Sequence, residues 1–569
     1  MPNAVSHFTP AFLTGALSVV CGFTILANPV SGQEPEPIEA GLAPTSLPYA
    51  PGLDVLHYDF ELALSESDES FLGRARVRLA LVEPLPDAIV LDLTGLAVEA
   101  VRLDGRDVEF ELSGGQLRIE RPAGQSDGAL TLDIRYRGTP DDGLILRNTL
   151  HGRPAVFADN WPNRARFWLP TIDHPSDKAT VRFTVHAPEM WQVVANGRLV
   201  QEPFVTRQNA LGDGAGRMTW IWETNVPISP YNMVIGATEF VVEIVGTAAC
   251  GRAPVAARTD GCVEVTYWVF APDAANATRK FARADEMVDF FSRTIGPFPF
   301  EKMANVQSAT RFGGMENASA IFYSERSVAN NPDDGVVSHE IAHQWFGDAV
   351  TEASWSHLWL SEGFATYFGA LFFEQAEGSD VFRERMEQGR QSYIRSDVTG
   401  QPVVHEEASL FDLLNPNNYP KGGWVLHMLR GLLGDDIFFL GIREYYRRYL
   451  HQVVLTEDFQ AVMEEASGQD LDWFFHQWLF EPGYPILQIS HDWDRANGEI
   501  VLTVEQVQDA TWPTFRFPAE VELRFSTGTA RTPIEISARR SVIRIGAVEN
   551  PQVVRFDPDG WVLKDIGTP

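Results

Sequence analysis

Hydrophobic and polar residues alternate along the first half of the chain. Short alternating runs dominate between His57 and about Gly246, among them residues 58–62, 130–134 and 181–185. A period of two places successive side chains on opposite faces of a strand, so this pattern predicts β-strands. The N-terminal part is therefore predicted to be an all-β domain.

The spacing of apolar residues then changes to that of helices. After one more expected strand at Val263–Phe270, helical spacing recurs at 276–293, 371–395, 423–433 and 471–479, and around residue 339. Beyond Pro485 the alternation returns at 486–490, 499–504, 519–525 and 542–545, and about 80 residues suit a small β-sandwich. We predict a multidomain α+β protein with an N-terminal β domain at 45–246, a mostly helical domain at 247–485 and a C-terminal β-sandwich domain at 486–569.

Two histidines, His339 and His343, flank a glutamate in the helical part of the chain. Four residues apart on a helix, their imidazoles lie about 5–6 Å from each other on one face and can bind one metal ion. Glu340 would lie beside the open position of that metal, where its carboxylate can take a proton from water. Glu362, nineteen residues after His343, is expected to supply the third ligand from a following helix.

The nature of these ligands predicts the metal and its chemistry. Two imidazoles and one carboxylate suit Zn²⁺, which takes nitrogen and oxygen ligands tetrahedrally, so we expect one zinc ion per chain. The metzincin pattern would require glycine at 346 and histidine at 349, where Phe346 and Ala349 stand. The sequence therefore indicates a zinc peptidase whose third ligand comes from further along the chain.

A segment upstream, Gly313-Gly314-Met315-Glu316-Asn317, together with the metal motif resembles the M1 family of zinc aminopeptidases. The resemblance implies a thermolysin-like catalytic domain in which this segment runs beside the substrate and pairs with its extended backbone. It also implies that Glu316 binds the free α-ammonium of the substrate through a charge-assisted contact. The resemblance covers roughly residues 45 to 490.

A second segment, Tyr419-Pro420-Lys421-Gly422, is similar to the Tyr-x-Lys-Gly segment of that family. The resemblance implies that Tyr419 donates a hydrogen bond to the oxyanion of the tetrahedral intermediate. A phenol next to a metal is suited to this role because it helps where negative charge develops.

The chain departs from the family at two places. Many members carry a Gln-x-Glu or Gln-x-Gln pair that helps to hold the substrate amine, where this chain has Asp159 and Trp161. Either one amine contact is missing or Asp159 supplies it; in another interpretation, Trp161 is an aromatic wall of the substrate pocket. The chain also stops before the large helical fourth domain of many members, which implies a more open active site.

These features together predict an aminopeptidase acting on peptides with a free N-terminus. Two alternatives remain: a zinc endopeptidase, which the change at Trp161 allows, and a non-catalytic binding scaffold, which could lose the zinc ligands that are all present here. The chain has 45 basic and 77 acidic residues, a formal charge of −32, which argues against nucleic acid and anionic membranes as partners. A hydrophobic content of 44% is ample for the cores of several domains.

The first residues predict a secretory signal peptide at 1–32, followed by a linker at 33–44. The apolar stretch 11–27 lacks a positively charged start, so a membrane anchor is the alternative, although 17 residues are few for a bilayer span. An exported, periplasmic or secreted, protein is expected. In such a protein the isolated pair Cys250 and Cys262 would form one disulfide, whereas two free thiols are expected in a cytosolic one.

Overall fold

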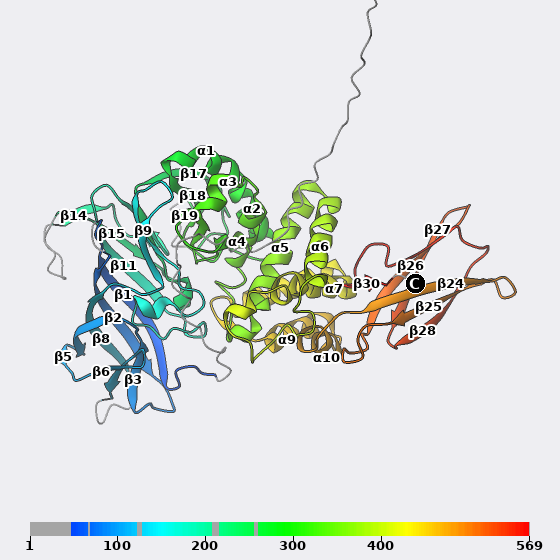
Figure 1. Ribbon diagram of the computed structural model, residues 1–569, viewed down its shortest axis with the longest axis horizontal. Coiled ribbons are helices and arrows are strands. Elements are labelled where there is room, and N and C mark those ends of the chain that lie inside the picture. The colour runs from blue at the N-terminus through cyan, green and yellow to red at the C-terminus, as the bar shows by residue number, and fades with distance from the viewer. Residues whose placement is uncertain (1–46, 67–68, 122–127, 207–215, 255–259, 568–569) are drawn as a thin grey trace, which may run out of the picture.

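The computed structural model describes residues 47–66, 69–121, 128–206, 216–254 and 260–567. Three regions follow one another along the longest axis of the molecule: the sheets of the first half, a mainly helical body and the C-terminal sheets (Figure 1). The predicted signal peptide, the linker and the apolar stretch 11–27 lie outside the described residues. Among the described residues, no helix has the length and apolar character that crossing a bilayer requires.

The described residues of the first region form three sheets, in agreement with the all-β domain that the alternating pattern predicts. The largest has nine strands in the order β13-β15-β11-β1-β2-β8-β4-β5, with β14 paired to β15, and sheets of four (β12-β16-β10-β9) and three strands (β3-β7-β6) accompany it. Every second residue of β2 is buried from Phe71 to Leu81, so the hydrophobic face of this sheet packs inward. The strands are β1 Leu53–Ala63, β2 Phe71–Leu81, β3 Ala88–Asp92, β4 Ala97–Leu103, β5 Arg106–Asp107, β6 Glu111–Ser113, β7 Gln116–Glu120, β8 Ala129–Gly138, β9 Leu144–Asn148, β10 Pro154–Ala158, β11 Thr180–Ala187, β12 Gln192–Ala195, β13 Arg198–Leu199, β14 Phe204–Thr206, β15 Arg217–Glu223 and β16 Ile235–Thr238.

The central body contains a mixed five-stranded sheet in the order β17-β18-β19-β21-β20. Its strands are β17 Phe240–Ala248, β18 Val263–Phe270, β19 Met303–Ser308, β20 Gly314–Met315 and β21 Ala320–Ser324, and a two-stranded sheet pairs β22 Thr351–Glu352 with β23 Val453–Val454. The alternating pattern predicted β18 and most of β17, and the family resemblance implied the extended segment that contains β20, whereas β19 and β21 were not predicted. All residues of β19 are buried, so this strand shows no alternation that a sequence pattern could reveal. The first strand, β17, crosses the predicted domain border at residue 246.

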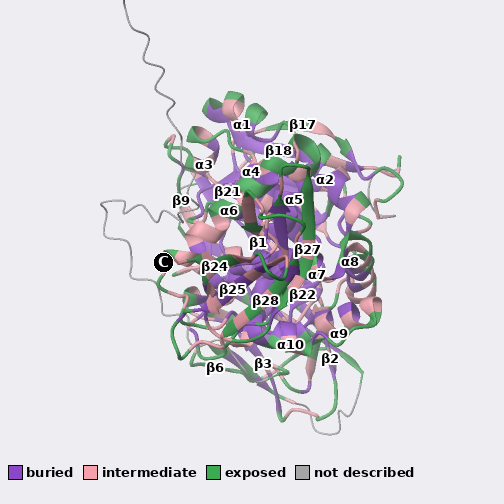
Figure 2. Cartoon of the chain, turned by 90° about the vertical axis from the view of Figure 1, so that its right-hand side faces the viewer, coloured by how far each residue is buried: buried purple, intermediate pink, exposed green. Residues whose placement is uncertain are grey.

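Ten α-helices complete the central body as far as the structure describes it. They are α1 Ala274–Lys280, α2 Ala284–Thr294, α3 Glu325–Asn330, α4 Gly335–His343, α5 Trp359–Glu377, α6 Ser379–Ile394, α7 Gly422–Leu433, α8 Asp435–Tyr449, α9 Thr456–Ser467 and α10 Asp472–Phe475. Two π-helical segments, Asn417–Lys421 and His476–Phe480, precede α7 and follow α10. Every residue of α5 from Trp359 to Phe373 except Thr366 is buried, so this helix forms the core of the central body, where Figure 2 shows mostly buried residues.

Two predicted helices are interrupted in the structure. The segment 276–293 consists of α1 and α2, separated by the turn at Phe281–Arg283. The segment 371–395 consists of the end of α5 and of α6, which are separated at Gly378. In both cases the helical spacing of apolar residues continues across the break because both helices turn apolar faces towards one core. Helices α8 and α9 were not predicted.

The C-terminal region is a two-sheet structure, which confirms the predicted β-sandwich. One sheet has the order β28-β25-β24-β30 and the other β27-β26-β29. The strands are β24 Ile486–Asp494, β25 Glu499–Gln506, β26 Phe517–Arg524, β27 Thr529–Ile536, β28 Arg540–Gly546, β29 Val553–Phe556 and β30 Asp565–Ile566. The sandwich docks on the helices, since the ring of Trp561 stacks on His427 of α7 at 4.6 Å and Gln477 exchanges two hydrogen bonds with the backbone of Arg516.

Candidate metal centre

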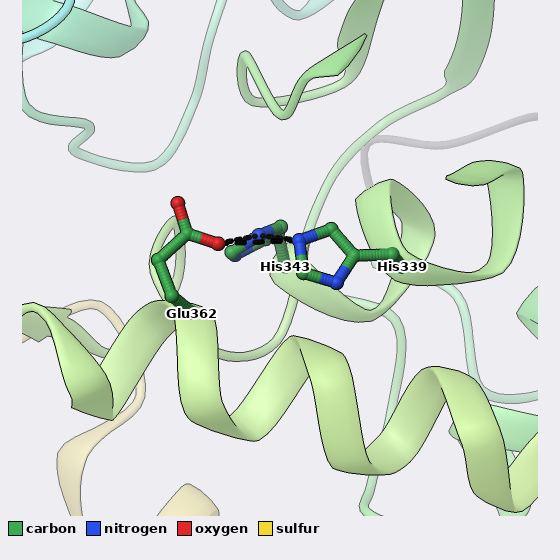
Figure 3. Close-up of side chains that lie close together, drawn as sticks. All are labelled: His339, His343 and Glu362. Carbon is green, nitrogen blue, oxygen red and sulfur yellow. Dashed lines mark hydrogen bonds and ion pairs between the residues drawn. The ribbon is translucent and has the colours of Figure 1, made fainter. Parts of the chain in front are cut away.

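Two neighbouring helices bring the three predicted metal ligands together. His339 and His343 lie one turn apart on α4, and Glu362 lies in the first turn of α5 (Figure 3). The Nε2 atoms of the two histidines are 3.0 Å apart, and each is 3.2 Å from Oε2 of Glu362. The three ligand atoms therefore converge on one point.

Zinc fits this set in geometry and in charge. Ligand atoms bound tetrahedrally at about 2.0–2.2 Å lie roughly 3.3–3.6 Å from one another, close to the separations found here. Burial raises the pKa of Glu316 to about 7 and that of Glu340 well above its usual range, with Glu362 adding to both shifts and His343 opposing them. Burial also acts against ionisation of Glu362, but His343 and His339 outweigh it and hold the pKa of that carboxyl below its usual range. A bound cation would compensate the negative charge of these buried carboxyl groups, so the charges around the two imidazoles favour a metal ion at this point.

The orientation of His343 is fixed from behind by polar groups. Its Nδ1 lies 3.1 Å from the carbonyl oxygen of Phe346 and 3.0 Å from Oγ of Ser361, so Nε2 is left to face the metal position. Gly347 makes this approach possible. Its φ is +115°, and a Cβ there would lie 2.4 Å from Oγ of Ser361 and 3.1 Å from Nδ1 of His343.

Glu340 lies beside the metal ligands and against the predicted substrate segment. A carboxyl oxygen of Glu340, one of Glu316 and a ring nitrogen of His343 all lie within 4.8 Å of one another. A Cβ on Gly314 would lie 2.1 Å from Oε1 of Glu340, so only glycine lets strand β20 pass this close. The carboxyl group predicted to be the general base is therefore between the metal ligands and the substrate segment.

Tyr419 reaches the same centre from the π-helical segment Asn417–Lys421. Its hydroxyl donates a 2.7 Å hydrogen bond to Oε1 of Glu362, and its ring stacks on His339 at 6.0 Å. Burial, followed by the nearby Glu362 carboxylate, raises the pKa of Tyr419 well above its usual range, so the phenol keeps its proton. A protonated phenol beside the metal ligands can donate to an oxyanion.

The segment from Gly313 to Asn317 lies at the edge of the central sheet. Strand β20 pairs with β21 alone among the described strands, so no described strand pairs with its other edge, where an extended peptide could add as a further strand. Glu316 follows directly and is buried, with its backbone carbonyl held by Nε2 of Gln344 at 2.7 Å. Asn317 is also buried, and Nδ2 of its side chain lies 3.5 Å from the carbonyl oxygen of Met315.

Asp159 is paired with arginines. Its Oδ1 accepts a 2.5 Å hydrogen bond from Arg164, which also donates to Asp142, and its Oδ2 lies 3.5 Å from Nε of Arg311. Asp159 is fully buried in this cluster of two acidic and two basic groups. These ion pairs balance the charge of the carboxylate, although its Oδ2 accepts no hydrogen bond among the described residues. Glu316, whose carboxyl oxygen lies within 4.8 Å of ligand atoms of Glu340 and His343, is the better placed group for a substrate amine.

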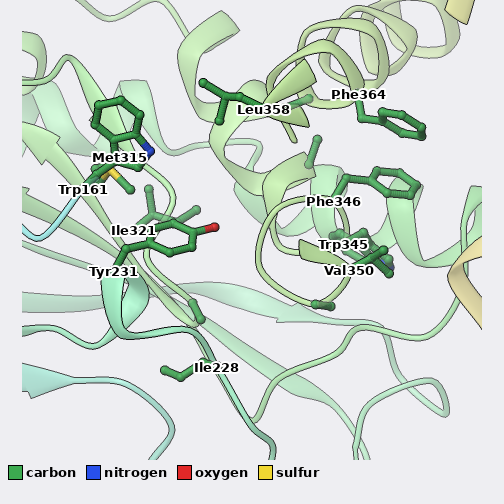
Figure 4. Packing of buried hydrophobic residues seen from close by; sticks show 14 of the residues in the cluster. Trp161, Ile228, Tyr231, Met315, Ile321, Trp345, Phe346, Val350, Leu358 and Phe364 are labelled. Carbon is green, nitrogen blue, oxygen red and sulfur yellow. The ribbon is translucent and has the colours of Figure 1, made fainter. Parts of the chain in front are cut away.

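Trp161 belongs to an aromatic cluster next to the substrate segment. Its ring makes edge contacts with Phe312, Trp355 and Phe411 at centroid distances of 5.5–6.1 Å. The side chain is only 3% exposed, within the buried cluster that also contains Tyr231 and Met315 (Figure 4). This packing favours the interpretation of Trp161 as part of an aromatic wall.

Cys250 and Cys262 form a disulfide, as the sequence predicts for an exported protein. The bond joins the end of β17 to the start of β18 at the far side of the sheet order from β20. It therefore lies away from the metal ligands and closes the connection between the two strands.

Sequence reasoning missed Gln344, the residue directly after His343. Besides holding the backbone of Glu316, its Nε2 donates to Oδ2 of Asp348 at 2.6 Å, and its Oε1 accepts from the backbone of Ser319 at 2.8 Å. The position of Gln344 directly after the predicted metal ligand His343 was a sequence signal that it could support the site. Two of its partners, Glu316 and Ser319, come from the connection between β20 and β21, which no local pattern reveals.

Comparison with known proteins finds two matching domain families. Residues 55–231 match the peptidase M1 N-terminal domain, and residues 280–478 match the peptidase family M1 domain. Probable aminopeptidase 2 of Sulfurisphaera tokodaii is 25% identical over 441 residues, which are 72% of this chain and 52% of that protein. Aminopeptidase M1-A of Oryza sativa is 28% identical over 393 residues, 64% of this chain and 42% of that protein. The chain thus spans about half the length of the curated relatives it matches.

Solved structures share the same architecture. An M1 zinc metallopeptidase from Deinococcus radiodurans is 26% identical, with a TM-score of 0.63 over 75% of this chain and 93% of that one. A Legionella pneumophila aminopeptidase A, solved in complex with aspartic acid, has a TM-score of 0.78 over 91% of this chain and 60% of that one. At 17% identity the second likeness concerns the fold alone.

Proposed function

Because this chain belongs to the M1 family of peptidases, we propose that it is a zinc-dependent aminopeptidase that removes N-terminal residues from peptides. The observation that carries the proposal is the position of Glu316, whose carboxyl oxygen lies within 4.8 Å of the nearest ligand atoms of Glu340 and His343. A carboxylate so close to the metal ligands can hold an α-ammonium only when the first peptide bond of the substrate is at the metal. The names of several relatives, which are aminopeptidases, support the same activity.

The residues around the metal divide the reaction between them. One zinc ion held by His339, His343 and Glu362 would supply a Lewis acid that activates water and polarises the scissile carbonyl. Glu340 takes the proton from the attacking water and delivers it to the leaving amine. Tyr419 donates its hydroxyl hydrogen bond to the oxyanion, for which it must leave Glu362.

Substrate binding depends on the edge of the central sheet. The open side of β20 would pair with the backbone of a peptide in extended form, while Glu316 holds its α-ammonium. The aromatic cluster around Trp161 would line the adjoining wall. Peptides with a free N-terminus are therefore the proposed substrates.

We expect Glu316→Ala to lower kcat/KM on unblocked peptides by roughly tenfold to 200-fold. A buried carboxylate-to-ammonium contact contributes about 1.5–3 kcal/mol. Acetylation of the substrate N-terminus should impose a similar loss on the parent enzyme. Rates of both enzymes on free and acetylated versions of one peptide form a double-mutant cycle.

The two losses should not add, because each removes one partner of the same contact. Fully additive losses would mean that Glu316 does not bind the amine. Rapid cleavage of the acetylated peptide by the parent would instead favour an endopeptidase. Glu316→Gln is the matched variant of equal volume, and it should lose as much as the alanine variant if charge is what the amine requires.

We also propose that the protein is exported, since the Cys250–Cys262 disulfide agrees with the signal-like residues at its start. Protein taken from its native compartment and alkylated without reductant should show no label on either cysteine. Labelling of both by mass spectrometry would contradict export. The same sample reports whether residues 11–27 are retained, which a membrane anchor requires and a cleaved signal peptide does not.

A further inference from the structure

The chain contains only five lysines, and none of them is exposed. Lys280 and Lys421 are fully buried, and Lys178, Lys302 and Lys564 are half-buried. Taking an ammonium group out of water is unfavourable unless its three donors find acceptors. The Nζ of Lys421 has no hydrogen-bond partner among the described residues, whereas that of Lys178 has three carbonyl acceptors on different residues. Lys178 is therefore the amine whose contacts match a group with three donors.

Lys178 connects the N-terminal region to the segment that follows α4, the helix of His339 and His343. Its Nζ donates to the carbonyl oxygens of Asp348 at 3.0 Å, Ala349 at 2.9 Å and Gln452 at 3.3 Å. Three donors thus meet three acceptors. Burial lowers the pKa of Lys178 to about 7, and the carboxyl groups of Asp348 and Glu352 oppose part of that shift.

The segment that Lys178 holds is the turn between α4 and β22, residues 344–350. Its carbonyl at Phe346 faces Nδ1 of His343 at 3.1 Å. The next carbonyl, at Gly347, accepts hydrogen bonds from the hydroxyls of Tyr231 at 3.0 Å and Thr351 at 2.5 Å. One side of the turn therefore orients a metal ligand, and the other side is held by Lys178 and Tyr231 of the N-terminal region.

The same turn also supports the amine-binding carboxylate. Asp348 accepts from Gln344 at 2.6 Å, and Gln344 holds the backbone carbonyl of Glu316 at 2.7 Å and the backbone N–H of Ser319 at 2.8 Å. Because Gln344 contacts both Asp348 and Glu316, a displacement of Asp348 would also shift the backbone that directly follows strand β20.

We propose that Lys178 is a positioning residue, which fixes the turn 344–350 from the N-terminal region and thereby sets the orientation of His343 and the place of Glu316. The inference deepens the proposed function, on which its catalytic part depends. Groups that orient a ligand in this way typically change metal affinity or activity about 10–100-fold when they are removed. The N-terminal region is then part of the metal site and more than a neighbouring module.

The test is Lys178→Met, which keeps the length of the side chain and removes its donors. We expect zinc to bind about 10–100-fold more weakly in competition with a chelator, at a temperature well below unfolding. In metal-free protein, the backbone amides of residues 346–350 should exchange hydrogen faster than in the parent. The matched control is Lys564→Met, which removes a lysine amine bound to Asp557 in the C-terminal sandwich and should leave both measurements unchanged.

Zinc affinity and exchange equal to the parent's in Lys178→Met, even with a lower melting temperature, would assign Lys178 a structural role alone and overturn the proposal. If that variant does not fold, the same measurements are made on Tyr231→Phe, which removes the hydroxyl that donates to the carbonyl oxygen of Gly347 in the same turn. It should weaken zinc binding and speed exchange in the same direction by a smaller factor, and parent-like values would overturn the proposal. Both readouts are independent of peptide cleavage, so an inactive parent protein would refute the proposed function while leaving this inference to be judged by its own result.

Discussion

Glu340→Gln is expected to bind zinc like the parent and to hydrolyse peptides at least about 10²-fold more slowly. The three converging ligand atoms belong to His339, His343 and Glu362, so replacing Glu340 by glutamine leaves all three metal ligands in place. The amide cannot take the proton of the attacking water, and general acid–base assistance is worth about 10²–10⁴-fold. Elemental analysis of zinc content tests the expected metal binding, and kcat on one unblocked peptide tests the expected loss of rate.

The control for this prediction is His343→Ala, which should lose both zinc and activity because it removes a ligand. The contrast between the two variants separates metal binding from proton transfer. Hydrolysis at the parent rate by zinc-loaded Glu340→Gln would mean that another group accepts the proton, and the proposed mechanism would then be wrong.

Tyr419→Phe is expected to lower kcat by roughly 10²-fold with little change in KM. Its hydroxyl contacts Glu362 at 2.7 Å in the resting protein and would meet negative charge that exists only in the transition state. Phenylalanine keeps the ring that stacks on His339, so packing beside the metal ligands should be preserved.

Steady-state kinetics on the same peptide tests this expectation, with zinc content measured in parallel. A variant changed only in KM would assign Tyr419 to substrate binding. A variant that has lost zinc would show that the hydroxyl mainly supports Glu362 as a ligand.

The metal site could be predicted because its signal is local. His339, Glu340 and His343 lie within five residues, and helix geometry alone places the two imidazoles on one face. The third ligand required only that a second helix follow, and α5 begins three residues before Glu362. The fold class could be predicted for a similar reason, since alternation within each strand or helix reflects its own burial.

Features that depend on distant partners could not be predicted. Asp159 was a candidate for the substrate amine, but its role depends on Arg311, which is 152 residues away in the chain and 3.5 Å away in space. The same holds for Lys178, whose acceptors lie 170 or more residues further on. No local sequence pattern places the amine of Lys178 next to these carbonyl oxygens.

The lack of an exposed lysine also has a practical consequence for handling the protein. Reagents that acylate amines normally attach to proteins at many surface lysines and give mixed products. Here all five side-chain amines lie in the described part of the chain and none belongs to an exposed residue; that of Lys564, for example, is paired with Asp557 at 12% side-chain exposure. These five side-chain amines should therefore react slowly in the folded protein and faster once it unfolds, so amine acylation would report the loss of the folded structure.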